Sequence, residues 1–172
     1  MIKWLVGRNL RAFSNRYDYD TGYMHEVLEV DAGAILKLAL ARSFLGHAGT
    51  LPAAVWHAAR LRATLAADCG PCLALAVKMA EEDGMTKNTI AAILKGNVVD
   101  PDLQLAIVYA DAVVANRPEY LASIQEVRER FGMAGLNGLS IAVVAGMFYP
   151  LYKRGLGHAT TCLPVLMALE AP

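Results

Sequence analysis

The stretch that decides the fold is Asp68-Cys69-Gly70-Pro71-Cys72, followed by the apolar run Leu73-Ala74-Leu75-Ala76-Val77-Lys78-Met79-Ala80. A helix is expected to begin here, because proline is tolerated in a first helical turn and Asp68 can cap the free N–H groups. Apolar residues then recur at the i, i+3, i+4 spacing of one helix face. Both cysteine sulfurs are therefore predicted to lie on the inward face, near the positive end of the helix dipole.

Two cysteines at this spacing fit a redox pair. A helix N-terminus lowers the pKa of a cysteine, and the thiolate is the reactive form. One cysteine can then resolve a mixed disulfide or sulfenic acid made by the other. Two alternatives stay open: buried cysteines that act as small apolar side chains, and half of a zinc site. No second Cys-x-x-Cys or His-x-x-His pair completes a zinc site.

The composition indicates one helical domain that associates with copies of itself. The chain has 172 residues, which fits a single domain over residues 1–172. Charged residues make up 19%, below the roughly 25% of an average domain, so we expect apolar surface to be covered in a homo-oligomer. The net charge of zero gives no reason to expect a nucleic-acid partner.

The cell compartment is predicted from the cysteines and from the N-terminus. Three cysteines in a chain of this length do not make a secreted disulfide framework. The apolar run Trp4-Leu5-Val6 is too short for a signal peptide. We therefore expect a cytoplasmic protein, with no cofactor and no membrane partner.

Residues 133–151 contain no charged side chain and approach the length of a membrane span. Asn137, Ser140 and Pro150, together with the glycines of this segment, favour a buried core or interface helix instead. Residues 1–25 carry aromatic and basic side chains. They are predicted to form an arm or first helix that packs on the body or on a neighbouring subunit.

The remaining patterns are those of an all-α protein. Capping residues, glycines and 3.6-residue apolar periods predict helices over residues 2–13, 26–46, 50–66, 69–83, 86–94, 100–116, 119–131 and 133–149. No segment alternates apolar and polar residues as a strand does. Residues 155–172 form a short tail.

Residues 50–162 resemble the alkylhydroperoxidase D-like family, also called the carboxymuconolactone decarboxylase family. The resemblance lies in a helix, then Ala-Asp-Cys-Gly-Pro-Cys, an alanine-rich helix, an acidic stop at Gly84, and Met85-Thr86-Lys87-Asn88-Thr89-Ile90-Ala91-Ala92-Ile93. Cys-Gly-Pro-Cys is also the tetrapeptide of thioredoxin, but no βαβ pattern surrounds it here. The resemblance implies a multi-helical, oligomeric AhpD-like domain. Members of this family include peroxide reductases, disulfide oxidoreductases and lactone decarboxylases.

The family pattern carries over only in part. Cys69 and Cys72 match its cysteine pair, and the resemblance implies that Cys72 attacks and Cys69 resolves. Helix position alone favours Cys69 as the thiolate, since the dipole effect fades within the first turn. The family places a Glu twelve residues before the first cysteine and a His four residues after the second. Those positions hold His57 and Ala76 here.

Two functions follow as hypotheses. The first is a thiol-disulfide oxidoreductase or weak peroxidase that acts on a small-molecule peroxide or a protein disulfide through Cys69 and Cys72, with His57 as an assisting base. The second is a non-redox helical oligomer that binds a small ligand or a protein partner, with His57 as a core histidine. A decarboxylase is a weaker third, because no placed acid/base group is identified. His158 and Cys162 are predicted to share a helix face and Cys162 to be buried, with too few ligands for a metal.

Overall fold

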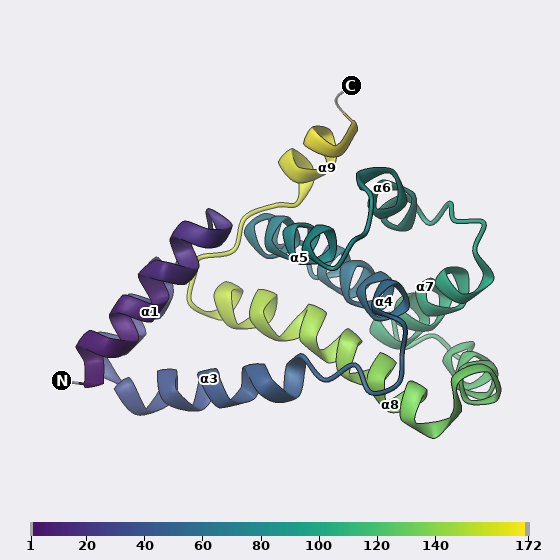
Figure 1. Cartoon of the computed structure of the whole chain (residues 1–172), viewed down its shortest axis with the longest axis horizontal. Helices are drawn as coiled ribbons and strands as arrows, with labels where there is room; N and C mark the ends of the chain where they lie inside the picture. The colour runs from purple at the N-terminus through teal and green to yellow at the C-terminus, as the bar shows by residue number, and fades with distance from the viewer. Residues whose placement is uncertain (1, 171–172) are drawn as a thin grey trace.

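The computed structural model describes residues 2–170, and this part of the chain is all-helical, with no strand (Figure 1). The all-α prediction is therefore confirmed. The helices are α1 (Ile2–Tyr17), α2 (Gly22–Val30), α3 (Ala32–Leu45), α4 (Ala53–Ala66), α5 (Gly70–Glu82), α6 (Lys87–Lys95), α7 (Pro101–Val114), α8 (Tyr120–Gly155) and α9 (Leu163–Glu170).

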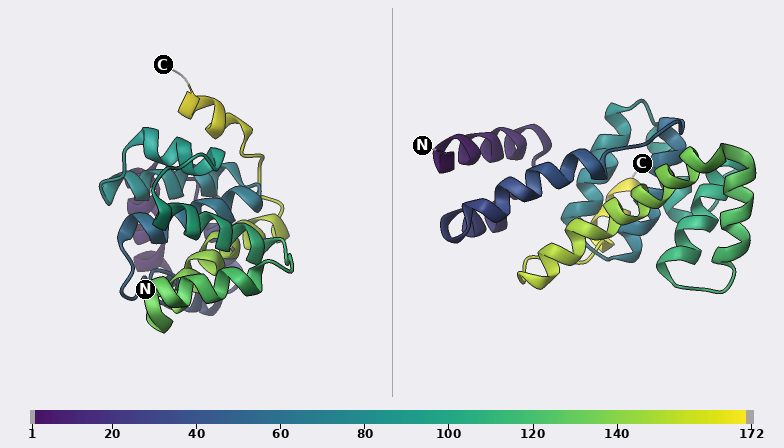
Figure 2. Two further views of the ribbon diagram at one scale, coloured as in Figure 1. Left: turned by 90° about the vertical axis from the view of Figure 1, so that its right-hand side faces the viewer. Right: turned by 90° about the horizontal axis from the view of Figure 1, so that it is seen from below.

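The core forms where α4 packs against α7 and α8. Its fully buried side chains come from α4 and from the helices around it, among them Leu61, Leu73, Ile93 and Leu139. In the right-hand view of Figure 2, α1 and α3 lie at one end of the molecule, α7 lies at the other, and α8 runs between them. The N-terminal helices therefore cover only one end of this core.

Local signals placed several helix ends correctly. Thr86 caps α6 by accepting a hydrogen bond from the N–H of Thr89, and Gly96 ends that helix in the left-handed conformation. The carboxylate of Asp100 accepts hydrogen bonds at the start of α7, with Pro101 in its first turn. These signals act within a few residues of the chain, which is why they could be identified before the fold was known.

The helix predicted over residues 26–46 is wrong, because two helices occupy that region. Asp31 leaves the helical conformation at φ −145° and ψ 82°, and its carboxylate accepts a hydrogen bond from the N–H of Ala34. An aspartate can cap a helix that starts after it, and this competes with continuing the helix through it. The first helix is also longer than predicted and ends at Tyr17.

Two further boundary predictions are wrong. Thr50 does not cap α4, since Pro52 holds the N-cap position and no side-chain capping bond forms. The segment 155–172 is not only a tail, because α9 forms within it. His158 and Cys162 precede α9, so they do not share a helix face.

Helix α8 contains the break predicted near residue 132. Gly132 has φ 69° and ψ −176°, which divides the helix into a polar first part and an apolar second part. By length and composition α8 could cross a membrane, and half of its most apolar window is buried against the rest of the fold. A core helix passes the same test, and the packing of α8 on α4 and α7 accounts for the buried half of that window.

Candidate functional site

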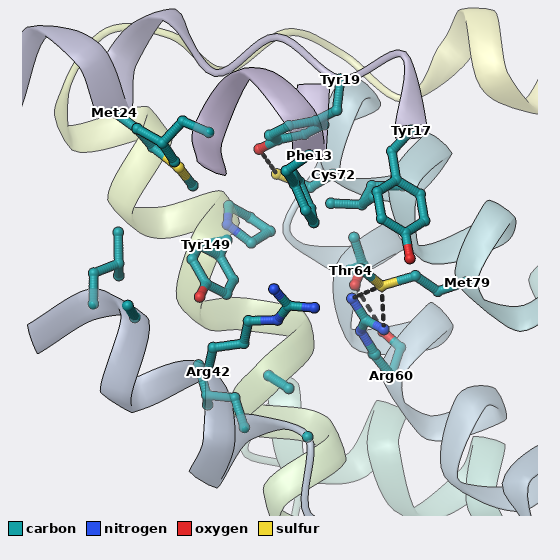
Figure 3. A pocket seen from close by; sticks show the side chains of 18 of the residues that line it. Phe13, Tyr17, Tyr19, Met24, Arg42, Arg60, Thr64, Cys72, Met79 and Tyr149 are labelled. Carbon is teal, nitrogen blue, oxygen red and sulfur yellow. Dashed lines mark hydrogen bonds between the residues drawn. The ribbon is translucent and has the colours of Figure 1, made fainter. Parts of the chain in front are cut away.

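A cavity of about 650 Å³ lies between α1–α3 on one side and α4, α5 and α8 on the other (Figure 3). This volume is within the range of about 300–1,000 Å³ that is typical of small-molecule pockets. Its wall is mostly apolar and aromatic and includes Phe13, Met24, Ile35, Trp56, Met79 and Tyr149. The cavity is therefore large enough for a small organic molecule.

Cys72 forms part of the cavity wall, whereas Cys69 does not line it and has no exposed surface. Cys69 is the N-cap residue of α5, and Cys72 lies in the first turn after Pro71. The hydroxyl of Tyr19 is 4.0 Å from the Cys72 sulfur and 3.4 Å from the hydroxyl of Tyr23. Of the two sulfurs, Cys72 is thus the one that a molecule in the cavity could meet.

The expected N-cap role of Asp68 is wrong. Asp68 has a positive φ of 47°, and its carboxylate accepts a hydrogen bond of 2.8 Å from the backbone N–H of Cys162. The N–H of Gly70 donates to the carbonyl of Thr160 at 2.7 Å. These bonds hold residues 156–162, which we call the C-terminal strap, against the start of α5. The Asp68 carboxylate therefore binds the C-terminal strap instead of capping α5, and Cys69 is buried beneath the strap.

The two thiols of the pair differ in acidity. The pKa of Cys69 is lowered to about 7, chiefly because the neighbouring Cys72 thiol can donate a hydrogen bond to its sulfur. The charges of Lys153 and Arg154 lower the pKa of Cys69 further, and burial opposes them. The pKa of Cys72 is raised by the same contact with Cys69 and then by burial. The favoured state is therefore a Cys69 thiolate that accepts a hydrogen bond from a neutral Cys72 thiol.

Lys153 is a cation next to this pair that sequence reasoning missed. Its side chain is buried, and the Nζ atom lies 4.9 Å from the ring centroids of both Tyr19 and Tyr23. Burial raises the pKa of both tyrosines, so they stay neutral and their rings can hold the cation. Lys153, Tyr19 and Cys69 come from separate elements, and no spacing in the sequence connects them.

The third cysteine also lies near this pair. Cys162 is buried at the end of the strap, which confirms the prediction for this residue. Burial raises the pKa of the Cys162 thiol to about 12, and the Asp68 carboxylate acts in the same direction. Cys162 is therefore protonated near neutral pH, and all three cysteines are free thiols.

His57 lies in the wall of the same cavity, on α4. Its Nε2 atom is 2.7 Å from a carboxylate oxygen of Asp83, which accepts this hydrogen bond. Burial lowers the pKa of His57, against the opposing effect of Asp83, so the ring is neutral near pH 7. Within residues 2–170 its hydrogen bond goes to Asp83 and none joins it to Cys72.

The structure thus brings Cys69 and Cys72 together and places His57 on the same wall as Cys72. Ala76 is buried on α5 and supplies no proton donor. The Nε2 atom of His158 is 3.1 Å from a carboxylate oxygen of Glu26. Among residues 2–170, no group of three or more His, Cys, Asp or Glu side chains is arranged to hold a metal ion.

No family model matches this chain, and it matches no curated protein and no solved structure.

Proposed function

We propose that this protein is a thiol-disulfide oxidoreductase with weak peroxidase activity, in which Cys72 attacks and Cys69 serves first as base and then as resolving thiol. The observation that carries the proposal is the placement of the Cys72 sulfur in the cavity wall, next to a buried Cys69 whose lowered pKa supplies a thiolate as base. Cys69 is buried, so it cannot meet a substrate first. It can take the proton of Cys72, whose thiolate then faces the cavity.

The reaction balances with an organic hydroperoxide as oxidant. The proton of Cys72 passes to the Cys69 thiolate, and the Cys72 sulfur attacks the terminal peroxide oxygen and breaks the O–O bond. Cys72 becomes a sulfenic acid, and the leaving alkoxide takes the proton from Cys69 to become an alcohol. The Cys69 thiolate then attacks the Cys72 sulfur, and hydroxide leaves with a proton from solvent as water. Turnover requires a dithiol reductant that opens the new disulfide.

Within this proposal His57 is not the base, since no hydrogen bond joins it to Cys72 among residues 2–170. With Nε2–H donated to Asp83, its Nδ1 carries the lone pair and has no hydrogen-bond partner among residues 2–170. That atom is buried, so a substrate reaches it only if the wall shifts. The absence of a proton donor at Ala76 fits slow turnover.

The all-helical fold and the cysteine pair at a helix start support an AhpD-like assignment, which we include in the proposal. We also propose a cytoplasmic location, on the basis of the few cysteines of the sequence. Alanine at position 76, where the family has a histidine, also fits the second candidate, a non-redox protein that binds a small ligand. The specific observation that favours this candidate is the cavity of about 650 Å³, which needs no cysteine chemistry to hold a ligand.

Single-cysteine variants treated with limiting tert-butyl hydroperoxide test the mechanism. Cys72→Ser should consume none. Cys69→Ser should consume one equivalent, more slowly because the base is gone, and should stop at a sulfenic acid that dimedone traps. Cys162→Ser is the matched control and should behave as the unmodified protein, forming one intramolecular disulfide per equivalent. Consumption by Cys72→Ser but not by Cys69→Ser would reverse the roles, and no consumption by the unmodified protein would favour the binding candidate.

We also propose a homo-oligomer, because large apolar side chains are exposed on the N-terminal helices. Leu40 is 75% exposed, Phe44 59% and Trp4 61%. Leaving such side chains in water is unfavourable compared with covering them by another subunit. Light scattering should give a mass that is a multiple of 18.5 kDa. A mass of one chain at all dilutions would contradict this.

A further inference from the structure

Arg60 is a cation without a matching acid. Its Nη1 and Nη2 atoms both donate to the Met79 sulfur at 3.2 Å, and its guanidinium lies 5.4 Å from the centre of the Trp56 ring. A thioether is a weak acceptor, whereas a guanidinium carries five N–H donors. Within residues 2–170 no carboxylate forms an ion pair with Arg60.

Other arginines of the fold are matched by acids. Arg62, two residues along the same helix, donates to both carboxylate oxygens of Asp111 at 2.9 and 2.6 Å and also to the carbonyl of Leu94. Arg130 pairs with both oxygens of Asp102 in the same way. Desolvating a cation is costly unless an anion compensates for the lost water. Arg60 therefore lacks the carboxylate partner that Arg62 has.

The free donors of Arg60 border the cavity. In Figure 3 the side chains of Arg42, from α3, and Arg60, from α4, point into the same space near Tyr149. Burial lowers the pKa of Arg60 more than the nearby Asp83 charge raises it, although a guanidinium stays protonated at any pH of interest. The cavity wall thus carries a partly desolvated positive charge that an anionic ligand could pair with.

The acids in the cavity wall are already engaged elsewhere. Glu82 accepts hydrogen bonds from Arg16 at 3.0 Å and from the Tyr17 hydroxyl at 2.8 Å. Asp83 accepts from His57 at 2.7 Å. Neither carboxylate makes an ion pair with Arg42 or Arg60 among residues 2–170.

We infer that the cavity binds a small molecule with an apolar body and one carboxylate, which the guanidinium of Arg60 holds while Arg42 attracts it from the rim. A guanidinium can hold a carboxylate with two parallel hydrogen bonds. The apolar and aromatic wall accounts for the body of the ligand. A singly charged head matches the half-buried guanidinium of Arg60 in the cavity wall. This binding site goes beyond the proposed redox function, since binding needs neither Cys69 nor Cys72 to react.

Calorimetric titration with decanoate, decanol and decyl phosphate tests the inference on the whole protein. Decanoate should bind one molecule per chain, at least about tenfold more tightly than decanol, because a hydrogen bond to a charged group contributes more than one between neutral groups. Arg60→Met should weaken decanoate binding to the level of decanol. Arg42→Met should weaken it less. Arg128→Met, which removes an exposed arginine of α8 remote from the cavity lining, is the matched control and should leave binding unchanged.

Several results would overturn the inference. These are equal affinity for decanoate and decanol, no binding of either, a preference for decyl phosphate over decanoate, or an equal loss of binding in Arg128→Met and Arg60→Met. The comparison of decanoate with decanol uses the unmodified protein, so it stands even if Arg60→Met does not fold. Because the measurement is of binding, its failure and a failure of peroxide consumption are separate results.

Discussion

Replacing Gly146 by alanine should lower the free energy of unfolding by about 2–3 kcal/mol, as expected for overpacking a tight core contact. Gly146 lies where α8 meets α4. A Cβ atom there would be 2.6 Å from the Cβ of Ala63, 2.6 Å from the carbonyl oxygen of Arg60 and 3.0 Å from the backbone nitrogen of Thr64. Two of these three are backbone atoms, so no change of rotamer relieves the overlap, and the helices must move apart. Urea unfolding followed by circular dichroism measures the loss.

Gly155 provides the matched control at the end of the same helix. Nothing lies within 4 Å of a Cβ atom at this position. Alanine favours a helix over glycine by up to about 1 kcal/mol, so Gly155→Ala should leave the stability equal or raise it. If Gly146→Ala were as stable as Gly155→Ala, the close approach of α4 and α8 would be refuted.

The second large effect is the ionisation of one thiol near neutral pH. The pKa of Cys69 is lowered to about 7, so about half of it is thiolate at pH 7, compared with about 3% for a free cysteine of pKa about 8.5. The ultraviolet absorbance of thiolates should therefore rise by one equivalent with a midpoint near pH 7. The pKa of Cys72 and that of Cys162 are both raised, so neither adds to this step.

Variants assign this step to Cys69. It should disappear in Cys69→Ser and persist in Cys162→Ser. In Cys72→Ala the midpoint should move up, because the thiol that chiefly lowers the pKa of Cys69 is gone. A step that persists in Cys69→Ser would contradict the assignment and with it the role of Cys69 as base.

The lowered pKa of Cys69 also makes the free energy of unfolding depend on pH. Between pH 7 and about 8.5 the unfolded chain holds the Cys69 proton and the folded chain has released it, so stability rises with pH over that window. Above about 8.5 the raised pKa of Cys72 acts in the opposite direction, because the folded state then holds the extra proton.

The sequence by itself determined the helical class and the helix ends that depend on neighbouring residues. Thr86, Gly96 and Pro101 act through the first or last turn of their own helix, where the chain within a few residues sets the free energy. The break at Gly132 has the same local origin, since its backbone conformation favours glycine. The proximity of Cys69 and Cys72 follows from their spacing alone.

Only the tertiary structure decided what these residues face. Asp68 was expected to cap α5, but its carboxylate binds the N–H of Cys162, 94 positions along the chain. The Nζ atom of Lys153 lies against the rings of Tyr19 and Tyr23, which are more than a hundred positions earlier in the sequence. Whether an arginine finds an acid likewise depends on neighbouring helices: Arg62 meets Asp111 from α7, whereas Arg60, two residues earlier on α4, meets a methionine sulfur and the cavity. Side-chain partners form between distant segments, and the energy that selects them exists only once those segments pack.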